Sequence, residues 1–155
     1  GTGGEGITDG NHDKATLAQP SGLSIASDGT VYFVDAESSA LRQMKDEKIE
    51  TLIGTGLFNF GLKDGAYPSA QMQHPQGLNE NAGRIYIADT YNNAIRVYDI
   101  NTMKLSTMKL DGVTLNEPTD IKVSDTMAYI VDTGNHRILN VDLTTMKANE
   151  LPITN

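Results

Sequence analysis

The sequence predicts an all-β fold made of three repeated units. An apolar stretch that ends in aspartate occurs three times, and each copy is followed by a polar turn and a second apolar stretch. The aspartates are Asp35, Asp89 and Asp132, so the repeat recurs after 54 and then 43 residues. Each copy reads as two strands and a turn, and this spacing is typical of the blades of a β-propeller. We therefore expect an all-β propeller segment of three four-stranded antiparallel blades.

Four short runs of strand-forming residues fill each unit. In the first unit they are PSGLSIA, TVYFVDA, ALRQMK and IETLIG, separated by turn-forming residues. The first run of each unit begins at a proline, namely Pro20, Pro75 and Pro118. An Asp-Gly pair stands eleven residues before the proline in the first two units and seven before it in the third, so the third connecting loop is four residues shorter. The expected organisation is a single segment over residues 1–155, with repeats at 1–53, 54–110 and 111–155.

The second run of each unit (VYFV, IYIA and AYIV) is apolar at consecutive positions. A sheet with one wet face would alternate apolar and polar residues, so both faces of these strands must be covered. No segment has a convincing helical period. In a propeller each sheet is covered by its two neighbours, which explains the pattern without helices.

Composition excludes several classes of function. The 155 residues are 38% hydrophobic and 21% charged, which is ordinary for a soluble domain. The net charge is −8 and the Lys and Arg residues are scattered, which disfavours binding to nucleic acid. No stretch has membrane-spanning length and no leader is visible, so we expect a soluble chain without membrane contact. There is no cysteine, and the sequence does not indicate a cellular compartment.

The three aspartates are expected to shape turns rather than to perform chemistry. A carboxylate can accept backbone N–H groups in a tight corner. In the following turns, Asn92, Asn93 and Asn135 tolerate a positive φ.

Arginine follows the aspartate in each unit. Arg42 and Arg96 stand seven residues after it, whereas the third unit has Arg137 five residues after it. Repeated arginines could line a groove for carboxylates or pair with the acidic surface, and we prefer the surface interpretation.

Two patterns near the start of the sequence suggest ligand sites without meeting the requirements of those sites. The run GTGGEG at residues 1–6 fits a dinucleotide fingerprint, but it neither follows a strand nor opens a helix. Asp9, Asn11 and Asp13 have the opening spacing of a calcium loop, but Lys14 replaces the glycine.

Three histidines could form a zinc triad only from equivalent places in the blades. His12, His74 and His136 stand at non-equivalent places, and no nucleophile motif occurs. We predict no cofactor, no metal and no catalytic residue.

The motifs DTYNNAIRVYD and DTGNHRILNVD resemble the NHL repeat, whose Asn-His-Arg-Ile pattern is matched well in the third unit and loosely in the first. The resemblance to the NHL-repeat β-propeller family covers nearly the whole chain. It implies that a thioredoxin-like domain precedes a six-bladed propeller in a longer parent protein. This chain would then be the C-terminal half of that propeller.

Strand order predicts where a partner would bind. In an up-and-down sheet, the turns after the second strands lie at the same end as the long loops between blades. Loops carry function more often than the scaffold does. That end would gather the candidate partner-binding residues Phe58, Phe60, Tyr67, His74, Tyr91, Asn92, Asn93, Asn135 and His136. Phe58 and Phe60 could anchor a protein or peptide, or could fold back onto the next blade.

The function predicted from the sequence is a non-catalytic interaction scaffold for protein or peptide partners. The alternative is half of an enzymatic six-bladed propeller, such as a metal-dependent lactonase, lyase or esterase, with an active site on the axis. Three blades leave two apolar sheet faces open. Either the remaining blades belong to a longer parent chain, or two copies form a homodimer that completes a six-bladed ring.

Overall fold

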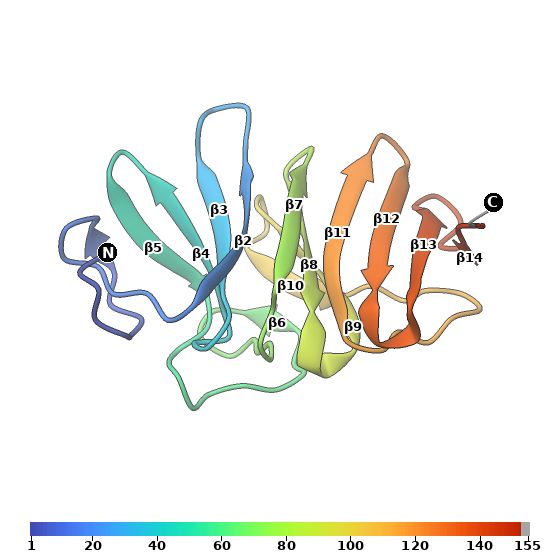
Figure 1. Ribbon diagram of the computed structural model, residues 1–155. Coiled ribbons are helices and arrows are strands. Elements are labelled where there is room, and N and C mark those ends of the chain that lie inside the picture. The colour runs from blue at the N-terminus through green and yellow to red at the C-terminus, as the bar shows by residue number, and fades with distance from the viewer. Residues whose placement is uncertain (153–155) are drawn as a thin grey trace.

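A computed structural model of the chain describes residues 1–152 and contains three antiparallel sheets arranged as neighbouring blades (Figure 1). The predicted all-β propeller segment is confirmed. Each blade has four main strands, and the first two sheets gain a fifth strand of two residues. The last residues of the third predicted repeat, 153–155, lie outside the described residues. None of the helices in residues 1–152 has the length and apolar character that spanning a membrane requires.

The main strands of each blade run in chain order from the inner edge to the outer edge. The first blade contains β2 (Pro20–Ile25), β3 (Val31–Asp35), β4 (Ala40–Lys45), β5 (Lys48–Ile53) and, beside β5, β1 (Gly10–Asn11). The second contains β7 (Gly77–Asn81), β8 (Arg84–Asp89), β9 (Ala94–Asp99), β10 (Lys104–Thr107) and, beside β10, β6 (Gly65–Ala66). The third contains β11 (Pro118–Ser124), β12 (Met127–Asp132), β13 (Arg137–Asp142) and β14 (Ala148–Glu150). Short 3-10 helices, η1 (Thr90–Asn92) and η2 (Thr133–Asn135), follow β8 and β12.

The second strand of the middle blade supplies apolar side chains to both neighbouring blades. We call the side of a blade toward the preceding blade its leading face and the other side its trailing face. Successive side chains of a strand point to opposite faces. In β8, Ile85 and Ile87 on the leading face pack with the first blade, whereas Tyr86 and Ala88 on the trailing face pack with the third.

Two apolar clusters hold the three blades together. One joins the trailing face of the first blade to the leading face of the second, and includes Leu41, Leu78 and Leu105. The other joins the second blade to the third, and includes Ile121 and Leu139. A smaller cluster covers part of the leading face of the first blade, where Ala15 of the N-terminal segment packs on Phe33 and Ile49. The core therefore lies between the sheets and not within any one of them.

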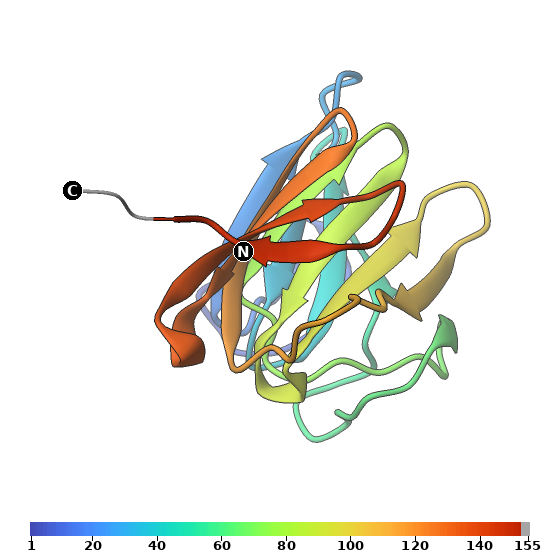
Figure 2. The ribbon, with the colours of Figure 1, turned by 90° about the vertical axis from the view of Figure 1, so that its right-hand side faces the viewer.

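The turns alternate between two ends of the blades. The β3–β4 turn, η1 and η2 lie at the lower end in Figure 1, and the β2–β3 and β7–β8 turns lie at the upper end. Figure 2 shows the long loop of residues 54–64 below the sheets, at the same end as η1. The end predicted to gather the long loop and the turns after the second strands is thus the lower end.

The inner strands β2, β7 and β11 lie side by side because glycine lets their backbones approach closely (Figure 1). A Cβ at Gly22 would lie 2.5 Å from the carbonyl oxygen of Gln76, and one at Gly77 would lie 2.5 Å from that of Thr119. Real Cβ contacts are longer, so any side chain at these two positions would push neighbouring blades apart.

We expect Gly77→Ala to lower the free energy of unfolding by about 1–3 kcal/mol, because the added methyl group overpacks the contact between β7 and β11. The measurement is equilibrium unfolding in urea. Gly4→Ala is the control, since its Cβ would meet nothing closer than 3.5 Å. Equal stability of the two variants would contradict the close approach.

Candidate functional site

The three repeated aspartates are buried and shape the lower end of each blade. Each carboxylate accepts the backbone N–H of a residue in the loop that leads into its own inner strand. The donor and acceptor pairs are Ala18 with Asp35 (2.7 Å), Gln73 with Asp89 (2.7 Å) and Asn116 with Asp132 (2.8 Å). The carboxylates thus attach the connecting loops to the second strands.

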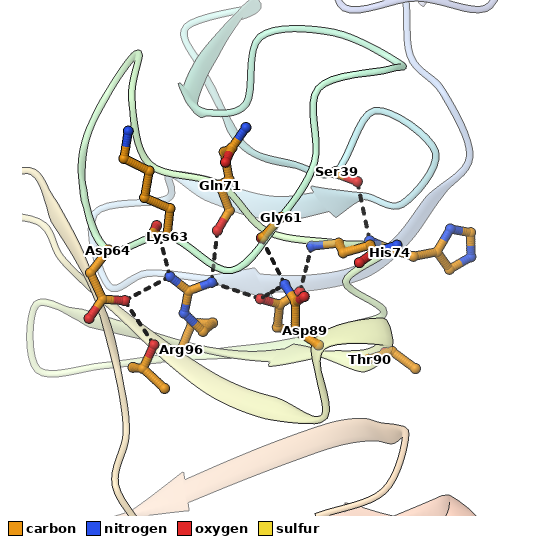
Figure 3. A network of polar contacts seen from close by, with 12 residues as sticks. Ser39, Gly61, Lys63, Asp64, Gln71, His74, Asp89, Thr90 and Arg96 are labelled. Carbon is orange, nitrogen blue, oxygen red and sulfur yellow. Dashed lines mark hydrogen bonds and ion pairs between the residues drawn. The ribbon is translucent and has the colours of Figure 1, made fainter.

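In the second blade a buried arginine extends this attachment into a clamp (Figure 3). Nη1 of Arg96 donates to Oδ2 of Asp89 at 2.8 Å and to the carbonyl oxygen of Gln71 at 2.8 Å. Nη2 donates to the carbonyl oxygen of Lys63 at 3.1 Å and to Oδ1 of Asp64 at 2.9 Å. One guanidinium therefore holds both ends of the loop segment between residues 63 and 71.

The first blade repeats the clamp with Arg42. Its Nη1 contacts Asp35 Oδ2 at 3.1 Å and the carbonyl oxygen of Thr16 at 2.6 Å. Its Nη2 contacts the carbonyl oxygen of Thr8 and Oδ1 of Asp9, both at 3.0 Å. Asp9 belongs to the sequence pattern that suggested a calcium loop, and here its carboxylate pairs with an arginine.

The surface interpretation of Arg42 and Arg96 is wrong, because both side chains are fully buried. They pair with aspartates that are also fully buried, and with carbonyl groups of the connecting loop. A planar guanidinium with five donors suits such a cradle, because it can satisfy several acceptors at fixed angles. The repeated arginines therefore stabilise the fold.

Burial and hydrogen bonding act in opposite directions on the clamp carboxylates. Burial raises the pKa of Asp35 and of Asp89, and the donors around each carboxylate only partly offset it. Burial also acts to raise the pKa of Asp64, but hydrogen bonds from Thr107 and Arg96 outweigh it and lower the pKa.

The third blade holds its shorter loop differently. Arg137 donates through Nε to Asp132 Oδ2 at 2.8 Å and through Nη2 to the carbonyl oxygen of Thr114 at 2.9 Å. Asn135 donates to the same two groups, at 2.9 Å and 3.1 Å respectively. Arg137 stands two positions closer to its aspartate than Arg42 and Arg96 do to theirs. From that position it reaches the carbonyl oxygen of Thr114 in the shorter loop.

The expectation of a positive φ is met at Asn93 and is wrong at Asn92 and Asn135. Asn93 has φ 53° and His136 has φ 56°, each directly after a 3-10 helix. Asn92 and Asn135 are the last residues of those helices, and their side chains donate to the neighbouring aspartates. Asn93 therefore provides the positive φ that the turn needs, whereas Asn92 and Asn135 donate hydrogen bonds to the buried aspartates.

Exposed apolar side chains gather on the loop of residues 54–64. Phe58 is 92% exposed, and Phe60 is about half exposed, so neither folds back onto the next blade as the alternative interpretation required. Leu62 in the same loop is also exposed. It was missed in the sequence, although the alternation of Phe58, Phe60 and Leu62 was a visible signal.

The base of this loop is fixed to the second blade. Nδ2 of Asn92 donates to the carbonyl oxygen of Gly61 at 2.8 Å and to Asp89 Oδ2 at 2.8 Å. The N–H of Gly61 bonds to the carbonyl oxygen of Met72 at 3.0 Å. Figure 3 shows Gly61 next to the clamp, so the exposed loop stands on a rigid support.

An aromatic pair lies at the same end. The rings of His74 and Tyr91 stack with centroids 4.5 Å apart, and Tyr91 is about half exposed. Nδ1 of His74 is 4.0 Å from Glu37 Oε2. We define the loop face as the exposed side chains of Phe58, Phe60, Leu62 and Tyr91 together with the partly buried ring of His74.

The remaining predicted residues lie near or outside this face. Tyr67 is exposed but follows β6, which pairs with the outermost strand, so it lies at the outer rim. Asn93 and His136 occupy the corners after η1 and η2. Pro20 and Pro118 begin inner strands, and Pro75 precedes the inner strand β7 by two residues.

The histidines and carboxylates of the described residues do not converge on a common point. Within residues 1–152 no three His, Cys, Asp or Glu side chains come together as a metal site. The backbone N–H of His12 bonds to Glu47 at the outer edge of the first blade, whereas His74 lies beside Tyr91 near the inner strands.

A groove of about 440 Å³ lies between the second and third blades, away from the loop face. Arg84, Tyr86, Met108, Leu143 and Met146 are among the side chains that line it. None of the residues predicted to bind a partner belongs to this groove.

Comparisons with known proteins agree with the repeat and the fold. The chain is 39% identical over 115 residues to NHL repeat-containing protein 2 of Bos taurus, in a match that covers 66% of this chain and 16% of that protein. The chain thus spans about a sixth of the length of that curated relative. No family model matches the chain. The resemblance to NHL-repeat proteins is confirmed.

Two solved structures show the same arrangement of strands. One is virginiamycin B lyase from Staphylococcus aureus, with a TM-score of 0.64 and 15% identity over 92% of this chain and 44% of that one. The other is the gluconolactonase XC5397 from Xanthomonas campestris, with a TM-score of 0.67 and 12% identity over 90% of this chain and 49% of that one. Likeness at this identity establishes the propeller fold and not a shared activity.

Proposed function

Since the chain is an NHL-type segment of a β-propeller, we propose that it is a non-catalytic scaffold whose loop face binds a peptide segment of a partner protein. The observation that carries this proposal is the exposure of Phe58, Phe60 and Leu62 in one loop. Large apolar side chains gathered in one place mark interaction surfaces, whereas single ones are ordinary.

The loop face has the features of a binding anchor. Covering a side chain such as Phe58 on binding stabilises a complex by about 1.5–3 kcal/mol. The anchoring of Gly61 by Asn92 and Met72 fixes the base of the loop, which lowers the entropy cost of ordering it in a complex. The stacked pair of His74 and Tyr91 adds an aromatic surface at the same end. We therefore expect the partner segment to carry large apolar side chains.

Panning a random-peptide display library on the immobilised chain tests this proposal. We expect enriched peptides that contain aromatic or aliphatic residues and that bind the Phe58→Ser/Phe60→Ser double variant at least tenfold more weakly in fluorescence anisotropy. Met103→Asn is the matched control, since Met103 is exposed in the β9–β10 turn with φ 55°, which asparagine tolerates. Failure to enrich any peptide, or equal affinity for the double variant, would contradict the proposal.

The enzymatic alternative predicted from the sequence stays a prediction. It requires a divalent ion on the propeller axis, and calorimetric titration of the chain with Zn²⁺, Ca²⁺ and Mn²⁺ tests it. Saturable binding of one ion would favour that alternative over the scaffold.

A further inference from the structure

The trailing face of the third blade exposes side chains that the other two blades bury. Each blade has a tyrosine three residues before its repeated aspartate, and this tyrosine points to the trailing face. Tyr32 and Tyr86 are each 6% exposed, because the next blade covers them, whereas Tyr129 is 42% exposed. Ile138 of the third blade is likewise 39% exposed, although its equivalents in the first two blades are completely buried. This face is thus half of a blade-to-blade contact.

The leading face of the first blade is the matching half. Leu23 of β2 is 61% exposed, whereas its equivalents Leu78 and Ile121 are buried against the preceding blade. Ile25 on the same strand is 65% exposed. The N-terminal segment covers Phe33 farther out on the sheet but leaves this inner part open.

A polar contact recurs at each internal junction and is incomplete at the two open faces. The residue four positions after the repeated aspartate accepts the N–H of the residue that precedes the next blade's inner proline. Ser39 Oγ accepts from His74 N–H at 3.2 Å, and Asn93 Oδ1 accepts from Glu117 N–H at 2.7 Å. Acceptor and donor residues all have positive φ.

His136 is the equivalent acceptor on the third blade, and Gln19 is the equivalent donor on the first, with φ 56° and 63°. Within the described part of the chain, the N–H of Gln19 donates to no other group. A neutral imidazole nitrogen can accept this hydrogen bond. The two open faces therefore agree in polar as well as apolar chemistry.

We propose that a second copy of this chain covers both faces. The trailing face of the third blade of each copy packs on the leading face of the first blade of the other copy. The two contacts are then identical and close a two-fold ring of six blades. Ring size supports this assignment, because one copy covers 44% and 49% of the two propeller structures to which the chain is similar.

The inner strand of the third blade differs from the inner strands of the other two blades at one position. Gly22 and Gly77 allow the next inner strand to approach, but Asp120 stands at the equivalent place in the third blade. A side chain there separates β11 from the β2 strand of the second copy. The new junction must therefore be wider at the axis than the internal ones.

The native mass of the chain at micromolar concentration, measured by light scattering after size exclusion, tests the proposal. We expect the mass of two chains. Leu23→Asp and Ile138→Asp each change an exposed residue, so the monomer still folds, and each is expected to give a monomer because every contact contains both positions. Mixing the two variants restores one intact contact and hence a dimer. Phe58→Ser on the loop face is the control and remains a dimer.

Several outcomes would overturn the proposal. A monomeric wild-type chain would leave both faces to blades of a longer polypeptide. A dimer that survives Leu23→Asp or Ile138→Asp would use a contact other than the one between the first and third blades.

Two further variants distinguish this junction from a general apolar association. His136→Gly suits the positive φ but removes the acceptor, so it is expected to weaken the dimer at least fivefold, whereas His136→Asn retains it as Asn93 does. Asp120→Gly is expected to strengthen the dimer severalfold. Equal dissociation constants for the glycine and asparagine variants at position 136 would contradict the polar contact.

Discussion

Arg96→Met is expected to lower the free energy of unfolding by about 3–5 kcal/mol, because it leaves the buried carboxylate of Asp89 without its charged partner. The same change removes the donors to the carbonyl groups of Lys63 and Gln71 and to the carboxylate of Asp64. Unfolding in urea, followed by circular dichroism, measures the loss. Arg84→Met removes the same charge from an exposed position and is the control, with an expected change within about 0.5 kcal/mol.

Arg96→Lys separates charge from geometry in the clamp. Lysine keeps the positive charge, but it cannot reach four acceptors in the plane of a guanidinium. We expect a loss between those of wild type and Arg96→Met. If lysine restored full stability, charge alone would account for the role of Arg96, and the contacts with the connecting loop would contribute nothing measurable.

Ile87→Ala is expected to destabilise the chain by about 2–5 kcal/mol, because Ile87 is fully buried between the first and second blades. The loss combines the transfer free energy of the removed methyl and methylene groups with the cost of the cavity that remains between the two sheets. The sheets cannot close this cavity fully, because their backbones are already in contact at the inner strands. Thermal and urea unfolding measure it. Phe58→Ala removes a larger side chain from the exposed loop and is expected to change stability by less than about 0.5 kcal/mol.

A similar loss for Ile87→Ala and Phe58→Ala would mean that the loop of residues 54–64 packs on the blades in solution. The binding surface proposed for Phe58 and Phe60 would then be covered. The stability of the Phe58 variant is thus a check on the proposed function that needs no partner.

Local patterns in the sequence were sufficient to predict the blades and their order. Short apolar runs and turn-forming residues are patterns of neighbours in the chain, so Asp35, Asp89 and Asp132 mark the turns after the second strands without a structure. The same order of strands and turns predicts which loops share an end, and it placed Phe58 and His74 at the lower end. That order does not reveal that Tyr67 lies at the outer rim, because the pairing of β6 with β10 is a contact between distant segments.

The sequence by itself determined three repeated all-β units that need neighbours on both faces. The consecutive apolar residues of the second strands and the spacing of the turns are patterns of residues close together in the chain. Only the tertiary structure decided that Arg42 and Arg96 are buried clamps, since their partners Asp9 and Asp64 lie more than thirty positions away in the chain. A long arginine side chain can reach solvent or a buried carboxylate from the same backbone position. The proposed contact between His136 and Gln19 also depends on the structure, because it follows only from comparing equivalent atoms at the two internal junctions.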